Sequence, residues 1–141
     1  MRIKKTVEKL VSQYHTRNPL EIADRMGISV TRDPLGDIQG YYILYSGIKC
    51  ICINSEIEDM NEIRVIAGHE LGHAVMHETE RCMFYPNTLF SRDKTELEAN
   101  RFAAELLIPD QIILDNPGMT KSQIARLSGY NERIMEFKRI K

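Results

Sequence analysis

The chain has 141 residues, the usual size of one compact domain, which leaves no room for two large ones. Hydrophobic residues make up 43% and charged residues 28%, so the composition excludes a disordered chain. No apolar stretch approaches the length of a bilayer crossing, and the basic N-terminal stretch lacks the apolar core of a secretory signal. Three cysteines, an odd number, suit a reducing compartment. We therefore expect a cytoplasmic protein with no membrane partner.

The net charge of −1 conceals an uneven distribution of charged residues. Residues 1–17 and 121–141 each carry a net charge of +4, whereas the stretch between them holds 8 basic and 17 acidic residues. Basic segments of this kind are usually solvated helix faces, and no nucleic-acid-binding signature accompanies them. Direct binding to nucleic acid is therefore not expected.

Two helices are predicted near the N-terminus. Apolar residues recur at helical spacing from Ile3 to Tyr14, which predicts an amphipathic first helix. The second helix is predicted to be capped by Asn18, to begin at Pro19 and to end at Gly27. The stretch IADRMGIS resembles the start of a helix-turn-helix module, but the residues after it are typical of extended chain, so no recognition helix follows.

Residues 40–54 change to a β pattern. Two runs rich in Tyr and Ile flank Ser46 and Gly47, and this arrangement predicts a hairpin. Residues 28–31 are expected to add a third strand and to complete a small antiparallel sheet. Cys50 and Cys52 share one face of the second strand, and we interpret them as small packed side chains rather than metal ligands.

Two longer helices are predicted in the second half of the chain. Residues 62–78 are apolar nearly all round, which indicates a buried helix. A loop is expected from there through Pro86, and residues 94–107 form the other helix, which Ile108 and Pro109 terminate. The remaining residues predict two or three short helices, one of them capped by Thr120 and ended by Gly129.

The buried helix contains His69-Glu70-Leu71-Gly72-His73, an H-E-x-x-H motif. Residues four apart lie above one another on a helix, so the two imidazoles converge on one ion. Glu70 is rotated by roughly 100° from His69, which lets it reach a water at that ion without being a ligand. Zinc bound in this way activates water, and a glutamate takes the proton as the water attacks a carbonyl. The motif therefore predicts His69 and His73 as zinc ligands and Glu70 as the catalytic acid and base.

The same helix contains Gly68 and Gly72, one before each histidine. A glycine inside a helix costs about 1 kcal/mol relative to alanine, so two of them indicate a close approach to the backbone. A neighbouring strand or the substrate chain is one explanation. Tight packing of the helix on the sheet alone is the other, and the sequence does not decide between them.

A catalytic zinc site needs a third protein ligand. His77 continues the four-residue series, but it stands about 12 Å from His69 along the helix axis, so we interpret it as a packing or orienting residue. Glu96 shares a helix face with Asn100, a residue able to orient a ligating histidine, whereas Glu98 lies on another face. Glu96 is therefore the predicted third ligand.

Peptide hydrolysis also needs a donor for the tetrahedral oxyanion. Tyr41, Tyr42, Tyr85 and His77 carry suitable groups. Tyrosines are more often half-buried packing residues, so this role stays open.

The motif HELGH is followed by E-x-x-A-N-x-F-A and LLIP, and preceded by NPLEIADRMGISV, a G-Y-Y run and ICIN. In these features the chain resembles the ImmA/IrrE family of zinc metallopeptidases over roughly residues 7–110. The resemblance implies an α+β fold with a minimal gluzincin-like core, in which a small antiparallel sheet packs on the motif helix and on a Glu-bearing helix. It also implies His69, His73 and Glu96 as metal ligands and Glu70 as the catalytic acid and base.

The resemblance further implies a domain organisation and a substrate. Residues 1–110 are expected to form the zincin-like metallopeptidase domain, and residues 111–141 a short helical extension packed on it. Family members inactivate helix-turn-helix repressors by cleavage, so a zinc endopeptidase that cleaves such a repressor is the predicted function. The alternative is a non-catalytic module that binds a repressor and holds a structural zinc, which the intact Glu70 disfavours.

Overall fold

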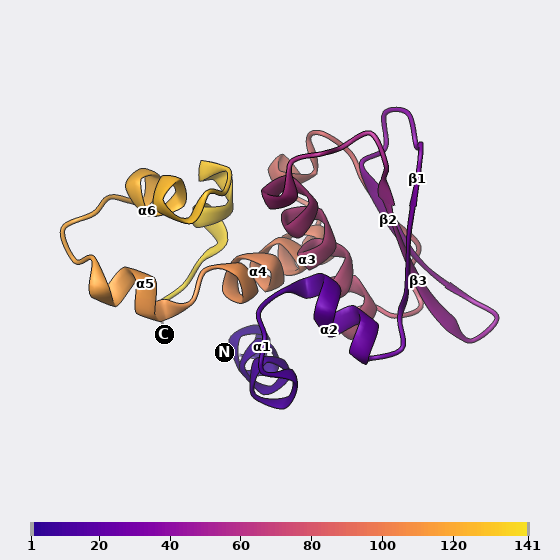
Figure 1. The fold of residues 1–141 in the computed structure, drawn as a ribbon, viewed down its shortest axis with the longest axis horizontal. Coiled ribbons are helices and arrows are strands. Elements are labelled where there is room, and N and C mark those ends of the chain that lie inside the picture. The colour runs from indigo at the N-terminus through magenta and orange to yellow at the C-terminus, as the bar shows by residue number, and fades with distance from the viewer. Residues whose placement is uncertain (1, 141) are drawn as a thin grey trace.

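The computed structural model describes residues 2–140, in which a four-stranded sheet lies on one side and the helices lie on the other (Figure 1). The strands are β1 (Ser29–Asp33), β2 (Gly40–Tyr45), β3 (Ile48–Asn54) and β4 (Cys82–Phe84). The α-helices are α1 (Arg2–Tyr14), α2 (Pro19–Arg25), α3 (Met60–Met76), α4 (Lys94–Leu107), α5 (Asp110–Asp115) and α6 (Lys121–Ser128). Two 3-10 helices complete the set, η1 (Thr88–Phe90) and η2 (Glu132–Phe137). The predicted α+β class is confirmed.

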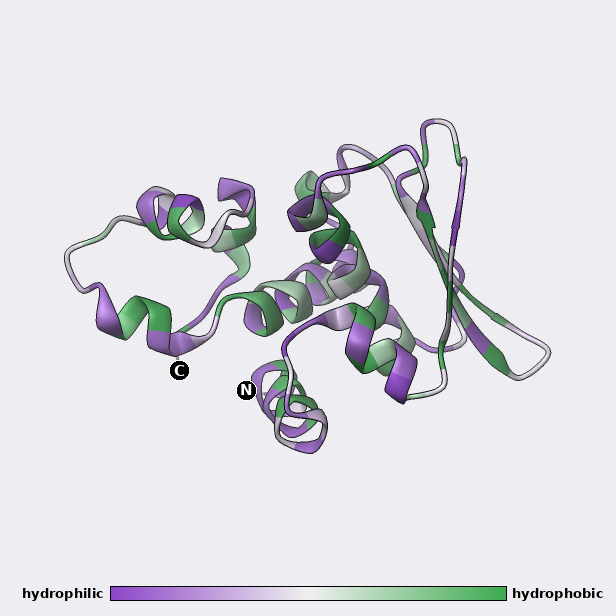
Figure 2. Ribbon diagram, in the orientation of Figure 1, coloured by the Kyte–Doolittle hydropathy of each residue, from purple (hydrophilic) through white to green (hydrophobic). Residues whose placement is uncertain are grey.

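The strand order of the sheet is β1-β3-β2-β4. The predicted hairpin is confirmed, since β2 pairs antiparallel with β3 across Ser46 and Gly47, both of which have positive φ. The expectation of a wholly antiparallel sheet is wrong, because β1 pairs with β3 in parallel. β1 lies beside the far strand of the hairpin rather than beside β2, so the two paired strands run in the same direction. β1 is largely exposed, and its second half is hydrophilic (Figure 2).

A fourth strand lies where the sequence predicted only a loop. β4 pairs antiparallel with β2, with Phe84 opposite Gly40 and Cys82 opposite Tyr42. Its pattern of burial alternates, so Cys82 and Phe84 are buried while Met83 between them is exposed. This edge strand therefore presents two side chains to the interior beside α3.

The helix α3 is the centre of the core. It contacts β2 and β3 on one side and α4 on the other, while α2 also packs against it. The apolar faces of α1 and α2 complete this core with Ile3, Val7, Leu10, Ile22 and Ala23, as their periodicity predicted. Asp59 caps α3 by accepting a hydrogen bond from the amide of Asn61.

The C-terminal helices α5 and α6 lie at the end of the molecule away from the sheet (Figure 1). Thr120 and Gln123 form a capping box at the start of α6, and Gly129 ends the helix in the left-handed conformation. The segment η2 packs on α4. Whether residue 110 is a domain boundary stays a prediction.

A buried ionic cluster fixes the end of the chain to α1 and α4. Lys138 Nζ lies 2.7 Å from Glu105 Oε1 and 2.6 Å from Asp110 Oδ1. Lys4 Nζ lies 2.9 Å from the same Asp110 oxygen. We call these four residues, Lys4, Glu105, Asp110 and Lys138, the ionic cluster. None of the helices within residues 2–140 combines the length and the apolar character that a bilayer crossing requires.

Candidate metal centre

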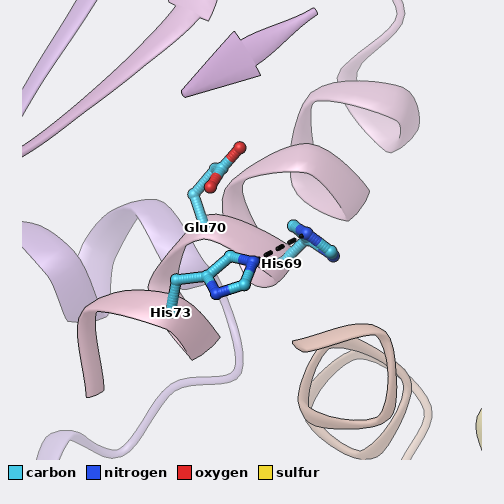
Figure 3. A group of neighbouring side chains, drawn as sticks. All are labelled: His69, Glu70 and His73. Carbon is cyan, nitrogen blue, oxygen red and sulfur yellow. Dashed lines mark hydrogen bonds between the residues drawn. The ribbon is translucent and has the colours of Figure 1, made fainter. Parts of the chain in front are cut away.

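The three residues of the H-E-x-x-H motif lie within the buried part of α3. His69 and His73 stand one turn apart with their rings in an edge-to-face contact, centroids 4.7 Å apart, and Glu70 extends from the turn between them (Figure 3). The exposed fractions of His69, Glu70 and His73 are 1%, 0% and 0%. Donor atoms of the three side chains lie within 4.8 Å of one another, as metal-binding groups do.

The two glycines of α3 mark its contact with α4. A Cβ at Gly68 would lie 3.3 Å from Ala103 Cβ, and a Cβ at Gly72 would lie 3.0 Å from Phe102 Cβ. The close approach that the glycines predicted is therefore made by a helix. Both expected explanations, a strand or substrate chain and packing on the sheet, are wrong for these two positions. The small residues bring α4 close enough to carry side chains to the histidines.

Glu96, in the first turn of α4, reaches the two histidines. Its Oε1 lies 2.7 Å from His69 Nε2 and 3.1 Å from His73 Nε2, and these two nitrogens are 3.1 Å apart. Glu98 points elsewhere and contacts His77 at 2.8 Å. Of the two carboxylates that the sequence offered, the structure brings Glu96 to the histidines.

Asn100 determines which nitrogen of His69 faces Glu96. Its amide Nδ2 donates to Thr88 O at 3.4 Å, which leaves Oδ1 to accept from His69 Nδ1–H at 2.7 Å. Burial lowers the pKa of His69, which favours the neutral imidazole. Its Nε2 faces a carboxylate oxygen at only 2.7 Å. A proton or a metal cation between the two atoms satisfies this contact.

The donor set fits a tetrahedral zinc ion. At zinc–nitrogen and zinc–oxygen distances of about 2.0–2.1 Å, tetrahedral ligand atoms lie about 3.3 Å apart. The three donor atoms here are separated by 2.7–3.1 Å, so a spread of a few tenths of an ångström accommodates the ion. Burial acts to raise the pKa of Glu96, but the histidine contacts outweigh it and lower the pKa to about 2. The carboxylate is therefore ionised, as it would have to be to bind a metal.

Glu70 is held beside these ligands with its own oxygens unpaired. Both carboxylate oxygens are buried, and neither has a hydrogen-bond partner within residues 2–140. Burial, and next the charge of Glu96, raise the pKa of Glu70 well above its ordinary value. Gly40 on β2 lies close to this part of α3, where a Cβ would come within 2.6 Å of Ile66 Cγ2 and would be in ordinary contact with Glu70 Oε2 at 3.9 Å. A buried carboxyl group without partners is the kind of group that takes part in proton transfer.

His77 is connected to the site through His73. The two Nδ1 atoms are 3.1 Å apart, and His77 Nε2 lies 2.8 Å from Glu98 Oε1. The sequence predicted an orienting or packing position for His77 and left Glu98 without a function. The spacing of four residues indicated that His77 could contact His73. The position of Glu98 on its helix did not indicate that its side chain would contact His77.

A pocket of about 490 Å³ opens onto the centre at Glu96. Of the four candidates for an oxyanion donor, Tyr85 alone lines this pocket. The hydroxyl group of Tyr42 instead donates to Glu78 O at 2.7 Å, and burial raises its pKa to about 12. His77 is engaged by His73 and Glu98.

The strand β4, which the sequence analysis missed, supplies two more side chains to this region. The ring of Phe84 packs edge-on against His69 with centroids 4.9 Å apart. Cys82 lines the same pocket as Glu96, and its sulfur lies within 4.8 Å of ligand atoms of His73 and Glu80. Burial, and next the charge of Glu96, raise the pKa of this thiol to about 12. Alternating burial over only three residues was too short a pattern to predict a strand.

Comparisons with known proteins identify the family of the chain. The chain is 38% identical over 140 residues to "Uncharacterized immunity region protein 2" of Bacillus phage phi105, covering 96% of this chain and 88% of the relative. It is 26% identical over 141 residues to "Metallopeptidase ImmA" of Bacillus subtilis strain 168, covering 96% of this chain and 83% of the relative. The model of the M78 peptidases, described as the IrrE N-terminal-like domain, matches residues 23–136. The chain therefore belongs to the IrrE N-terminal-like family of M78 peptidases.

Proposed function

We propose that this protein is a zinc-dependent endopeptidase in which His69, His73 and Glu96 hold the metal and Glu70 is the general base. The observation that carries the proposal is the convergence of two imidazole nitrogens and a carboxylate oxygen within 3.1 Å of one another, next to a buried carboxyl group without partners within residues 2–140. A structural zinc site has four protein ligands and needs no free carboxyl group beside it. Membership of a peptidase family supports the same reaction.

In the proposed hydrolysis, a zinc ion and Glu70 would have separate roles. A bound zinc ion supplies Lewis-acid activation of the scissile carbonyl group and of water. Glu70 takes a proton from the attacking water and then transfers it to the nitrogen atom of the leaving amine. The raised pKa of Glu70 favours this double use, because a carboxyl group that holds its proton more firmly is a better base and can still act as an acid.

Tyr85 is the proposed donor to the oxyanion. It lines the pocket that Glu96 also lines, and the residue is 44% exposed, so its hydroxyl group is available to a bound peptide. Within residues 2–140 its hydroxyl group donates a hydrogen bond only to the thioether sulfur of Met83, a weak acceptor that a substrate oxyanion replaces without loss. A Tyr85→Phe variant is expected to lower kcat about 100-fold and to leave zinc binding unchanged.

The proposed substrate is a helix-turn-helix transcriptional repressor, and the proposed compartment is the cytoplasm. The name of the phage relative places that relative in an immunity region. Residues 18–120 hold 17 acidic and 8 basic residues, and such a surplus attracts a basic DNA-binding protein. The three cysteines are unpaired, as in a reducing compartment.

Incubation of the zinc-loaded protein with a candidate repressor tests both parts of the proposal. Mass analysis of the products is expected to show one defined cleavage with the wild type and none with Glu70→Gln. Glu62→Gln, on an exposed position of the same helix, is the matched control and is expected to cleave normally. A repressor that is bound but never cut would instead support the non-catalytic module with a structural zinc. An unrelated protein cut as readily as the repressor would contradict the substrate assignment.

A further inference from the structure

We propose that Glu98, acting through His77, is a positioning residue that holds the His73 ring in the tautomer whose Nε2 faces Glu96 and thereby sets the zinc affinity of the site. The inference rests on the metal centre proposed above and adds a residue to it. Glu98 touches neither ligand atom of the two histidines that face Glu96. It acts at a distance, through one intervening imidazole.

The contacts form a chain of three side chains. Glu98 Oε1 lies 2.8 Å from His77 Nε2, and His77 Nδ1 lies 3.1 Å from His73 Nδ1. The remaining nitrogen of His73, Nε2, faces Glu96 and His69 at 3.1 Å. The chain therefore joins a carboxylate on α4 to a nitrogen atom of the metal centre on α3.

One arrangement of protons satisfies the hydrogen bonds among Glu98, His77 and His73. A neutral His73 that offers the Nε2 lone pair to a metal carries its proton on Nδ1. His77 Nδ1 must then accept that proton's hydrogen bond, so the proton of His77 is on Nε2. Glu98 is the acceptor that holds it there. Without Glu98, His77 is free to carry its proton on Nδ1, where it would face the Nδ1–H of His73 and push that proton toward the metal side.

The other histidine has a different and shorter support. His69 Nδ1–H donates directly to Asn100 Oδ1 at 2.7 Å, and Asn100 is oriented in turn by Thr88 O. An amide has a fixed acceptor atom, whereas an imidazole has two interchangeable tautomers. His73 consequently needs a further residue that His69 does not need, and Glu98 supplies it. The side chain of His77 is only 11% exposed, which limits competition from water for its hydrogen bonds with Glu98 and His73.

Hydrogen bonds behind metal-ligating histidines typically contribute 10–100-fold to metal affinity. We therefore expect Glu98→Ala to raise the dissociation constant for zinc by about 10–100-fold. The measurement is competition with a chromophoric chelator on the full chain. Glu98→Gln keeps an acceptor oxygen and is expected to recover most of the affinity. Glu62→Ala, on an exposed position, is the matched control and should bind zinc as the wild type does.

A double-mutant cycle separates positioning from a general effect on folding. In a His77→Leu background the hydrogen bonds from Glu98 to His73 are already lost, so Glu98→Ala is expected to cause no further loss of zinc affinity. The absorption spectrum of the cobalt-substituted protein should change in Glu98→Ala and be restored in Glu98→Gln. If Glu98→Ala does not fold when metal-free, the comparison of His77→Leu with His77→Gln decides, and His77→Leu is expected to have a dissociation constant for zinc about 10–100-fold higher.

Two results would overturn the inference. One is a Glu98→Ala protein that binds zinc within twofold of the wild type, and the other is an undiminished effect of Glu98→Ala in the His77→Leu background. Neither measurement uses hydrolysis. A wild type that binds zinc tightly, depends on Glu98 and cuts no repressor would contradict the proposed function and leave this inference intact.

Discussion

A cluster of polar side chains lies at each end of α4, and the two clusters differ in how their charges are compensated. At the C-terminal end, Lys138 and Glu105 are each only 3% exposed, and both cations of the ionic cluster contact acidic oxygens. At the N-terminal end, Glu96 Oε1 lies within 3.1 Å of a nitrogen atom of each of two imidazoles, and Glu70 beside them has no hydrogen-bond partner within residues 2–140. The ionic cluster pairs two cations with two carboxylates, whereas the group at the N-terminal end offers donor atoms that suit a metal ion.

This difference separates a structural role from a chemical one on the same helix. Buried ion pairs with satisfied hydrogen bonds hold segments together and change little when conditions change. A site whose donor atoms suit a metal ion is stabilised when that ion binds. The comparison therefore predicts that metal acts on one end of α4 and leaves the other unaffected.

Removal of zinc is expected to give the largest effect. A ligand present at about 1,000 times its dissociation constant stabilises the folded state by about 4 kcal/mol. Chelation should lower the free energy of unfolding of the wild type by about that amount, as measured by denaturant titration with and without zinc. A Glu96→Ala protein should show no difference between the two conditions. Equal stability of the wild type with and without zinc would contradict the proposed centre.

Breaking the ionic cluster should cost nearly as much stability and should leave metal binding alone. Lys138→Met removes the cation closest to Glu105 and leaves a buried carboxylate with the more distant Lys4, at 3.6 Å. Loss of one partner of a buried ion pair costs about 3 kcal/mol. The free energy of unfolding should fall by this amount, while the dissociation constant for zinc stays within twofold. A large change in zinc affinity would show that the two ends of α4 are coupled.

The unpaired carboxyl group of Glu70 predicts a pH-dependent gain in stability on substitution. Because burial raises its pKa, Glu70 keeps its proton in the metal-free folded protein above the pH at which the unfolded chain releases its own. Its contribution to stability is therefore complete at low pH and is lost as the pH rises from about 4.5 toward the folded-state pKa. Metal-free Glu70→Gln should unfold like the wild type at pH 4 and be about 2 kcal/mol more stable at pH 7.5.

The matched control for this experiment is Glu62→Gln, which changes the same charge at an exposed position of α3. It should follow the wild type at both pH values. An advantage of Glu70→Gln that is equally large at pH 4 would contradict the raised pKa as its cause.

The smallest effect is expected at the contact between α3 and α4. Gly72→Ala gains about 1 kcal/mol of helix propensity, but its Cβ would lie 3.0–3.2 Å from three atoms of Phe102, and overpacking costs about 2 kcal/mol. The net loss is about 1 kcal/mol, measured by thermal unfolding. At Gly68 the closest contact is 3.3 Å, so Gly68→Ala should be nearly neutral. The reverse order of the two variants would show that another contact controls the spacing of the helices.

Local patterns in the sequence were sufficient to predict much of the candidate centre. The four-residue spacing of His69 and His73 and the shared face of Glu96 and Asn100 are properties of a single helix, and the structure brings these four residues together. Their roles as ligands and orienting groups stay predictions until a metal is measured. The hairpin was predictable for the same reason, because its turn lies between its own strands.

Features that depend on contacts between distant segments were not predictable in this way. The parallel pairing of β1 with β3 depends on which strand β1 meets, and no residue of β1 encodes that choice. The contact of His77 with Glu98 joins residues 21 positions apart and uses a side chain on a face that helical geometry turned away from the centre. The ionic cluster joins Lys138 to Glu105 across 33 positions, and neither residue carries a local signature.

Residues 96–100 of α4 offer a compact target for redesigning the metal preference of the site. Glu96, Glu98 and Asn100 lie within a stretch of five residues, and between them they contact His69, His73 and His77. Metal selectivity depends on donor type and on the groups behind the donors, so a library confined to residues 96–100 varies both at once. Such a library would retune the preference for zinc, cobalt or manganese while α3 and its two imidazoles stay untouched.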